Sequence, residues 1–275
     1  MSKTYASSGS APAPTDPGRR GPLRKLVRIT VVLVSVALVG TVAYYALLHL
    51  LTRTDSSSSG IGGDVRSVEI VVDSGDIDVT AAEDGGDAGL ERKLTKSLRS
   101  PDEEIKKDGD TLRITTTCGD GPGKCASDYD LTVAPGTSVD ITTRLGDVNV
   151  KGLRAEAAAR SDLGDVKLED VRSDKVDAVT KVGDVTLDGT RFSDAVLRSK
   201  AGNIDVRGAG GEFDSLDATS KTGSVVLELP ESAGPFDVTA DAEIGDREVG
   251  VEEDSSGGAK VTAKTKLGDV TVRED

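Results

Sequence analysis

Eight short glycine turns recur along the chain, and their nearly constant spacing restricts the fold more than any other feature. Typical copies read LGDVNVKGL from Leu145, LGDVKLEDV from Leu163 and VGDVTLDGT from Val182. From the second copy onward, the turns follow one another at nearly even intervals. Self-similarity at a period of roughly 20 residues indicates a stacked repeat fold. The turn glycines are Gly75, Gly146, Gly164, Gly183, Gly202, Gly223, Gly245 and Gly268.

Apolar residues alternate with polar ones on both sides of each turn. VDAVTKV precedes the turn at Gly183, and DVTL follows it. A period of two predicts β-strands. No helical period is present in the repeats, which excludes βαβ units. Each repeat is therefore expected to be two short strands about a Gly-Asp bend.

We predict an all-β domain: a parallel β-solenoid (β-helix-like) of about eight short coils, preceded by one transmembrane α-helix. An antiparallel β-sandwich is the alternative. In-register columns favour the solenoid, because equal residues stack only when the coils are in register. Lone coils cannot bury a face, so caps are expected from the irregular segment Val65–Pro135 and from Arg273–Asp275. Three residues before the glycine, a column of small residues is expected to face inward: Thr143, Ser161, Thr180, Ser199, Ser220, Ala242 and Thr265.

An acidic or short polar residue follows each turn glycine: Asp76, Asp147, Asp165, Asp184, Asn203, Ser224, Asp246 and Asp269. We interpret these hinge residues as turn residues, whose side chains accept hydrogen bonds from nearby backbone N–H groups. The alternative is a calcium ladder, since carboxylates bind hard cations, formed by Asp147, Asp165, Asp184 and Asp269. The calcium-binding nonapeptide pattern is absent. A basic column expected to offset the acidic one stands two residues before the glycine: Arg144, Lys181, Lys200, Lys221 and Lys266.

Two cysteines, Cys118 and Cys125, bracket the loop GDGPGK between strand-like runs. A reactive pair would be expected at C-x-x-C spacing, and a zinc site needs more ligands. We predict a disulfide that closes a hairpin of an exported domain.

An apolar run from Ile29 to Leu51 contains no formally charged side chain. As a helix it spans roughly 35 Å, enough for the hydrocarbon core of a membrane. A cleaved signal peptide is the alternative, but the run is long and no A-x-A site follows it. Six basic residues precede the run and Arg53 alone follows it, so the N-terminus is expected in the cytoplasm. The expected parts are a disordered basic cytoplasmic tail, a transmembrane helix, a flexible linker and an extracytoplasmic β-repeat domain, at 1–28, 29–51, 52–63 and 64–275.

Composition excludes some functions. Residues 54–275 carry 27 basic and 47 acidic side chains, a formal charge of −20, which opposes nucleic-acid binding. The same region has no His or Trp and four aromatic residues, and it lacks G-x-S-x-G and zinc motifs. We therefore expect neither catalysis nor a cofactor.

Four segments together resemble a known family: SGDIDVT, TLRITTT, LTVAPGTSVDITTRLGDV and the GDV series that follows. They are similar to the putative-adhesin β-strand-repeat family of bacterial envelope proteins, whose domain has no known function. The resemblance covers roughly residues 65–275. It implies a β-helical domain on or facing the cell surface, in some members linked to envelope stress, and it supplies no catalytic residue.

These observations favour a single-pass cell-membrane protein whose extracytoplasmic domain acts in adhesion, as a scaffold or as an interaction module. Its partners are membrane lipid, through residues 29–51, and an unidentified protein or cell-wall polymer. Three alternatives remain: a β-helix enzyme acting on polysaccharide, a calcium-dependent binding module and an envelope-stress sensor.

Overall fold

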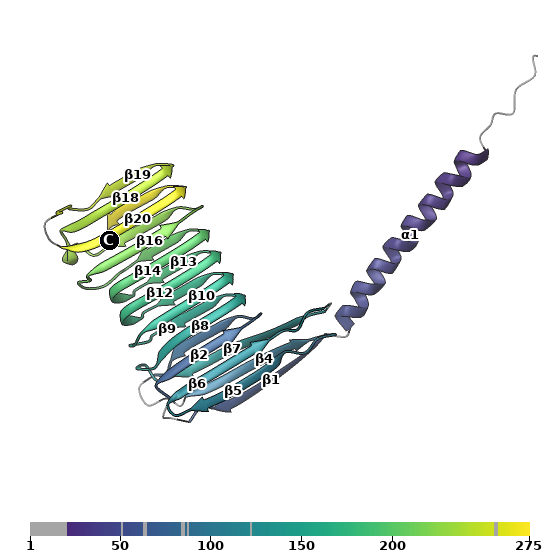
Figure 1. Cartoon of the computed structure of the whole chain (residues 1–275), viewed down its shortest axis with the longest axis horizontal. Helices are drawn as coiled ribbons and strands as arrows, with labels where there is room; N and C mark the ends of the chain where they lie inside the picture. The colour runs from purple at the N-terminus through teal and green to yellow at the C-terminus, as the bar shows by residue number, and fades with distance from the viewer. Residues whose placement is uncertain are drawn as a thin grey trace, which may run out of the picture. The chain divides into compact units, whose positions relative to one another are not determined.

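The computed structural model describes residues 21–50, 52–62, 65–83, 86, 88–121, 123–255 and 258–275. Helix α1 (Gly21–Leu50) forms one compact unit and the strands after it form a second (Figure 1). Within α1, the stretch Val27–Leu47 is long and apolar enough to cross a membrane.

Helix α1 begins before the expected spanning segment. Positions 1–20 of the predicted disordered tail lie outside the described residues, as does Leu51 at the predicted end of the span. Positions 21–28 are helical, where the sequence predicts disorder. The physical reason is local: Pro22 is compatible with the first turn of a helix, and the Leu, Arg and Lys residues after it are good helix formers.

The strand domain consists of two facing sheets. In spatial order, the first sheet contains β1 (Arg53–Gly60), β4 (Gly89–Lys96), β7 (Cys125–Val133), β3 (Ile77–Ala81), β9 (Val148–Lys151), β11 (Val166–Glu169), β13 (Val185–Asp188), β15 (Ile204–Arg207), β17 (Val225–Leu229), β21 (Val270–Glu274) and β19 (Arg247–Gly250). The second contains β18 (Phe236–Ile244), β20 (Ala259–Leu267), β16 (Ser215–Ser220), β14 (Arg191–Ala201), β12 (Arg172–Val182), β10 (Ala157–Leu163), β8 (Ser138–Leu145), β2 (Ser67–Val72), β6 (Thr111–Thr117) and β5 (Asp102–Asp108). A short 3-10 helix, η1 (Glu231–Ala233), follows β17.

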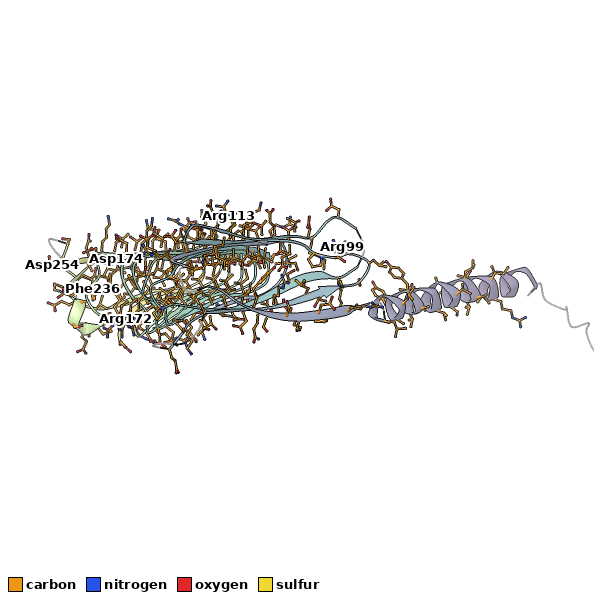
Figure 2. The ribbon with its side chains drawn as sticks, turned by 90° about the horizontal axis from the view of Figure 1, so that it is seen from below. Arg99, Arg113, Arg172, Asp174, Phe236 and Asp254 are labelled. Atoms are coloured by element: carbon orange, nitrogen blue, oxygen red, sulfur yellow. A yellow bond between two sulfur atoms is a disulfide. The ribbon has the colours of Figure 1, made fainter. Side chains whose placement is uncertain are left out.

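Strand pairing is parallel through the body of the domain. Strand β10 pairs in register with β8 and β12, and β11 pairs with β9 and β13. The two strands of one repeat lie in opposite sheets, so each repeat passes once through both layers (Figure 2). The result is a solenoid-like stack. The sandwich alternative requires antiparallel pairing throughout. Among the described strands, such pairing occurs at one end only: β1 with β4, β4 with β7, and β5 with β6.

The core between the sheets is narrow and built mainly from Val, Ile, Leu and Ala. Alternating side chains point inward, as the burial pattern of β10 and β11 shows. Large rings enter the core only toward its ends and along the edge opposite the turns. Phe213 lies between Phe192 and Phe236, with ring centroids 5.3 and 5.9 Å apart. Small side chains suit this fold because each coil has space for only a few inward residues.

The turn glycines are required by both conformation and space. Their φ angles lie between +133° and +154°, a region that side chains with a Cβ rarely adopt. A Cβ at Gly183 would also lie 2.1 Å from the carbonyl oxygen of Gly164 in the neighbouring coil. Adjacent turns therefore approach more closely than any other residue type permits.

Coils at both ends of the stack depart from sequence order. The β6–β7 pair lies outside the β2–β3 pair, and β20–β21 is inserted between β16–β17 and β18–β19 (Figure 1). The expected cap at Arg273–Asp275 is therefore wrong, because β18 and β19 end the stack on that side. At the other end, strands from the irregular segment Val65–Pro135, together with β1, form the antiparallel cover.

Charge favours the inserted position of β20. Its exposed side includes Lys260 and Lys264, whose register partners on β18 are Asp237 and Asp241. Lys266 Nζ lies 3.4 Å from Glu243 Oε1. Opposite charges on directly paired strands stabilise a sheet, whereas like charges destabilise it. Between β16 and β18, β20 therefore gives the acidic terminal strand a basic neighbour.

The segment expected as a flexible linker, residues 52–63, contains strand β1. It pairs antiparallel with β4 along its whole length, from Arg53 opposite Lys96 to Gly60 opposite Gly89. Asp55 Oδ2 lies 2.5 Å from Lys96 Nζ, and this contact lowers the pKa of Asp55. The edge of β4 offers unpaired backbone groups, and a serine-rich strand can satisfy them without any side-chain packing.

We expect Gly183→Ala to lower the free energy of unfolding by about 2 to 4 kcal/mol, because the turn conformation and the neighbouring carbonyl both oppose a Cβ. Gly136→Ala is the matched control, since no atom lies within 4 Å of a Cβ there. Urea unfolding of the full chain in detergent, followed by circular dichroism, measures both. Equal stability of the two variants would contradict the close approach of the turns.

Candidate functional surface along the turns

The inward column of small residues is hydrogen-bonded to the turns. Its hydroxyl side chains are buried, and each donates to the carbonyl oxygen of a turn glycine in the neighbouring coil. Thr180 Oγ1, for example, is 2.9 Å from Gly164 O, and Ser199 Oγ is 3.0 Å from Gly183 O. The same bond is made by Thr143, Ser161, Ser220 and Thr265. Ala242, in the terminal coil, has no hydroxyl to donate. The column therefore fixes each glycine carbonyl from inside the stack.

The hinge residues form a second ladder outside the glycines. Asp165 Oδ1 accepts the backbone N–H of Asp184 at 2.7 Å, and Asp184 Oδ1 accepts that of Asn203 at 2.6 Å. The chain of bonds runs in spatial order from Asp128 to Asp246, across the point where sequence order is broken. Its other members are Asp76, Asp147, Ser224 and Asp269.

The four carboxylates of the calcium alternative all take part in the hinge ladder. Asp147, Asp165, Asp184 and Asp269 lie in this one column, and each uses Oδ1 as acceptor for the next coil. Among the residues that the structure describes, no group of three or more His, Cys, Asp or Glu side chains is arranged to hold a metal ion. Asn and Ser keep the acceptor without a charge, so the ladder itself does not need carboxylates.

The basic column does not pair with the hinge carboxylates, contrary to expectation. Three of its members pair with acids in their own column, because these acids project from the same face of the second sheet. Arg144 Nε lies 3.2 Å from Asp73 Oδ1, and Lys181 Nζ lies 2.7 Å from Asp162 Oδ1. Lys266 pairs with Glu243.

An exposed apolar ridge lies between the basic column and the turn glycines. It consists of the residue directly before the glycine, and its large members are 47% to 66% exposed: Leu145, Leu163, Val182, Leu267 and Ile244. Alternation alone predicts these side chains to face inward, two residues after the buried hydroxyl column. The glycine bend instead begins there and turns them to the surface. The sequence signal for this exposed ridge is the apolar residue that stands directly before the glycine in repeat after repeat.

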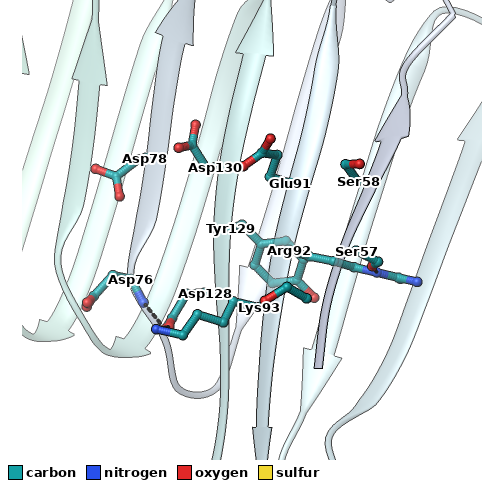
Figure 3. Close-up of a pocket in the computed structure, with 11 residues that line it drawn as sticks. Ser57, Ser58, Asp76, Asp78, Glu91, Arg92, Lys93, Asp128, Tyr129 and Asp130 are labelled. Carbon is teal, nitrogen blue, oxygen red and sulfur yellow. Dashed lines mark hydrogen bonds and ion pairs between the residues drawn. The ribbon is translucent and has the colours of Figure 1, made fainter. Parts of the chain in front are cut away.

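A shallow hollow of about 520 Å³ lies over β1, β4, β7 and β3. Asp78, Asp130 and Glu91 stand in one row across three neighbouring strands (Figure 3). Partial burial, followed by the charges of Asp78 and Glu91, raises the pKa of Asp130. The sequence does not indicate this row, because it joins strands that are far apart along the chain.

Beneath the hollow, Tyr129 closes the core with a polar network. Its hydroxyl donates to Glu103 Oε1 at 2.7 Å and lies 2.5 Å from Thr116 Oγ1. Arg92 pairs with the same Glu103. Burial of the ring is the main cause that raises the pKa of Tyr129 far above its ordinary value. A phenol held neutral in this way stabilises the end of the core and is not available as a base.

The disulfide between Cys118 and Cys125 is confirmed, with the two Cα atoms 5.9 Å apart. It closes the loop between β6 and β7, the position that a glycine turn occupies in the other repeats. Arg99 holds this loop from outside, since its Nη1 and Nη2 donate to the carbonyl oxygens of Gly119 and Gly123.

Parallel coils through two facing sheets, joined by glycine turns, define a solenoid-like β-repeat domain. The family model Toastrack DUF4097 matches residues 64–273. The chain belongs to this family, which confirms the resemblance drawn from its motifs.

A solved structure of a putative adhesin from Bacteroides fragilis shows the same fold. It aligns with a TM-score of 0.51 at 16% identity, over 81% of this chain and 97% of its own. Putative adhesins from Parabacteroides distasonis and Parabacteroides merdae also match over 81% of this chain and 97% and 96% of their own, with TM-scores of 0.43 and 0.40 at 12% and 13% identity. A comparison with curated proteins found no significant match.

We expect Asp184→Ala to cost about 1 kcal/mol, because the N–H of Asn203 loses its acceptor. Asp184→Asn keeps an acceptor and removes repulsion from Asp165, so its stability should equal or exceed that of the wild type. Urea unfolding of the full chain measures both. An Asn variant as unstable as the Ala variant would show that the charge, rather than the hydrogen bond, is what the hinge requires.

Proposed function

We propose that the chain is a membrane-anchored extracytoplasmic β-repeat protein that acts as an adhesion, scaffold or interaction module of the cell envelope, without catalysis. The observation that carries this proposal is the unbroken hinge ladder from Asp128 to Asp246. Such a ladder gives a stiff support whose outer faces repeat at constant spacing. Counting one coil per turn glycine gives about eight coils, a rod on the order of 40 Å long.

The anchor in this proposal is residues 29–51, with residues 1–28 in the cytoplasm and 64–275 outside. Support comes from the apolar helix and from the basic residues that precede it. The disulfide also favours an oxidising compartment for the strand domain.

The proposed partner is a protein or a cell-wall polymer. Polysaccharide enzymes need acid and base groups beside aromatic rings on which a sugar can stack. The four aromatic side chains of the strand domain, Tyr129, Phe192, Phe213 and Phe236, are all buried. Their burial supports binding without catalysis.

Cysteine labelling tests the topology. In intact cells, a membrane-impermeant maleimide should label Lys175→Cys and leave Ser8→Cys unlabelled until the cells are permeabilised. The expected cause is the excess of basic residues before the helix, which retains the N-terminus in the cytoplasm. Labelling of Ser8→Cys in intact cells, or a mature chain that lacks residues 1–51, would contradict the proposed anchor.

Retention on cell-wall fragments tests the function. Vesicles that carry the full chain should be retained by purified wall fragments, whereas empty vesicles should not. Retention should persist in EDTA, and no soluble sugar should be released. Loss of retention in EDTA would support the calcium-dependent module, and release of sugar would support the enzyme. Absence of retention would contradict binding to the wall.

A further inference from the structure

The basic column is uncompensated in the middle of the stack. Lys181, Lys200, Lys221 and Lys266 stand on neighbouring coils, about 4.8 Å apart along the stack. The two outer members have acidic partners at Asp162 and Glu243. Within the described part of the chain, Lys200 and Lys221 form no ion pair, and both side chains are exposed. Two like charges therefore face solvent side by side.

The hinge column loses its charge at the same two coils. Asn203 and Ser224 replace Asp after Gly202 and Gly223, while the ladder bonds continue through both. Other coils of the stack use Asp for this bond, so hydrogen bonding alone does not require a neutral residue here. The substitution removes negative charge beside the two unpaired lysines.

The apolar ridge is also interrupted at these coils. Small residues, Ala201 and Thr222, stand where Leu or Val stands in the neighbouring coils, and both are exposed. Two columns thus depart from the repeat at the coils that carry the unpaired lysines. We define the lysine patch as Lys200, Ala201, Asn203, Lys221, Thr222 and Ser224.

We propose that the lysine patch binds a linear phosphodiester polymer of the cell envelope, which runs along the stack across the coils. This inference rests on the proposed envelope function and names its partner. The surface is locally cationic on a domain of charge −20, so it selects an extended anion that contacts the patch without approaching the acidic faces.

The chemistry of the patch fits a chain of phosphodiesters. Each lysine ammonium is a compact point charge that can contact one phosphate of such a chain, and the patch contains no arginine fork for bidentate recognition of a single anionic group. No aromatic ring is exposed on the described part of the strand domain for a sugar to stack on. The ligand is therefore recognised through repeated charge rather than through its rings.

Binding of a synthetic ten-unit poly(glycerol phosphate) to the full chain in detergent tests the proposal. We expect Lys200→Gln/Lys221→Gln to lower the slope of log affinity against log salt concentration by about 0.7 per lost phosphate contact, as for single-stranded nucleic acids. Two lost contacts correspond to roughly 25-fold weaker binding at 0.1 M salt. Lys107→Gln/Lys175→Gln removes the same charge elsewhere on the domain and should bind as the wild type does.

A second variant leaves the lysines in place. Asn203→Asp/Ser224→Asp restores the residue that other hinges carry, so the ladder bonds should be retained while binding weakens several-fold. Repulsion between neighbouring carboxylates should lower the melting temperature slightly, and circular dichroism at the assay temperature checks that the variant is folded. Binding by both patch variants at wild-type strength would overturn the proposal, as would no binding by the wild type. Equal affinity for a ten-residue polyglutamate or for oligogalacturonate, with the same loss in the variants, would overturn the choice of phosphodiester.

The wall-fragment assay separates this inference from the function beneath it. If wild-type vesicles are retained and Lys200→Gln/Lys221→Gln vesicles are retained equally, the patch is not the binding site and the envelope function stands. If wild-type vesicles are not retained, the wall is not the partner, whatever the synthetic polymer does, and the envelope function then requires a protein partner.

Discussion

The close approach of successive turns is the constraint on which the rest of the structure depends. Six of the turn glycines present their carbonyls to a buried hydroxyl, and the hinge residues present acceptors to the next coil. Both bonds require coils in register, and a Cβ at the glycine would prevent both. Backbone pairing alone would allow one strand to shift along the next, whereas these side-chain bonds fix the register between neighbouring coils.

Because the buried residues and the turns fix the register, the outward-facing residues contribute little to specifying the fold. The columns outside the turns vary: one contains both acids and bases, large apolar residues give way to small ones in another, and Asp gives way to Asn or Ser in the third. Departures from the repeat on these faces are therefore open to a functional explanation. A repeat protein of this kind can vary its outer residues within a few positions of one turn without losing the bonds that hold the coils in register.

Much of this arrangement could be predicted from local sequence, and some of it could not. The glycine spacing and the period of two predict parallel coils, and the column of small hydroxyl residues predicts which side of the strands faces the core. The inserted position of β20 places its lysines, Lys260 and Lys264, opposite acids on β18, a full repeat earlier in the chain, and no local pattern predicts this pairing. Strand β1 forms because an edge of β4 is available, and the sequence of RTDSSSSG alone reads as a linker. The acidic row of Asp78, Asp130 and Glu91 likewise exists only once distant strands are adjacent.

The insertion of β20–β21 has a consequence for how the chain is completed. The strand partner of β18 is β20 and that of β19 is β21, so neither strand has its sheet neighbour until residues 259–274 are in place. A chain that folds from its N-terminus can add coil to coil as far as β16–β17, and the terminal coil is completed only after β20–β21. A chain cut before residue 259 would leave the edges of β16 and β17 unpaired.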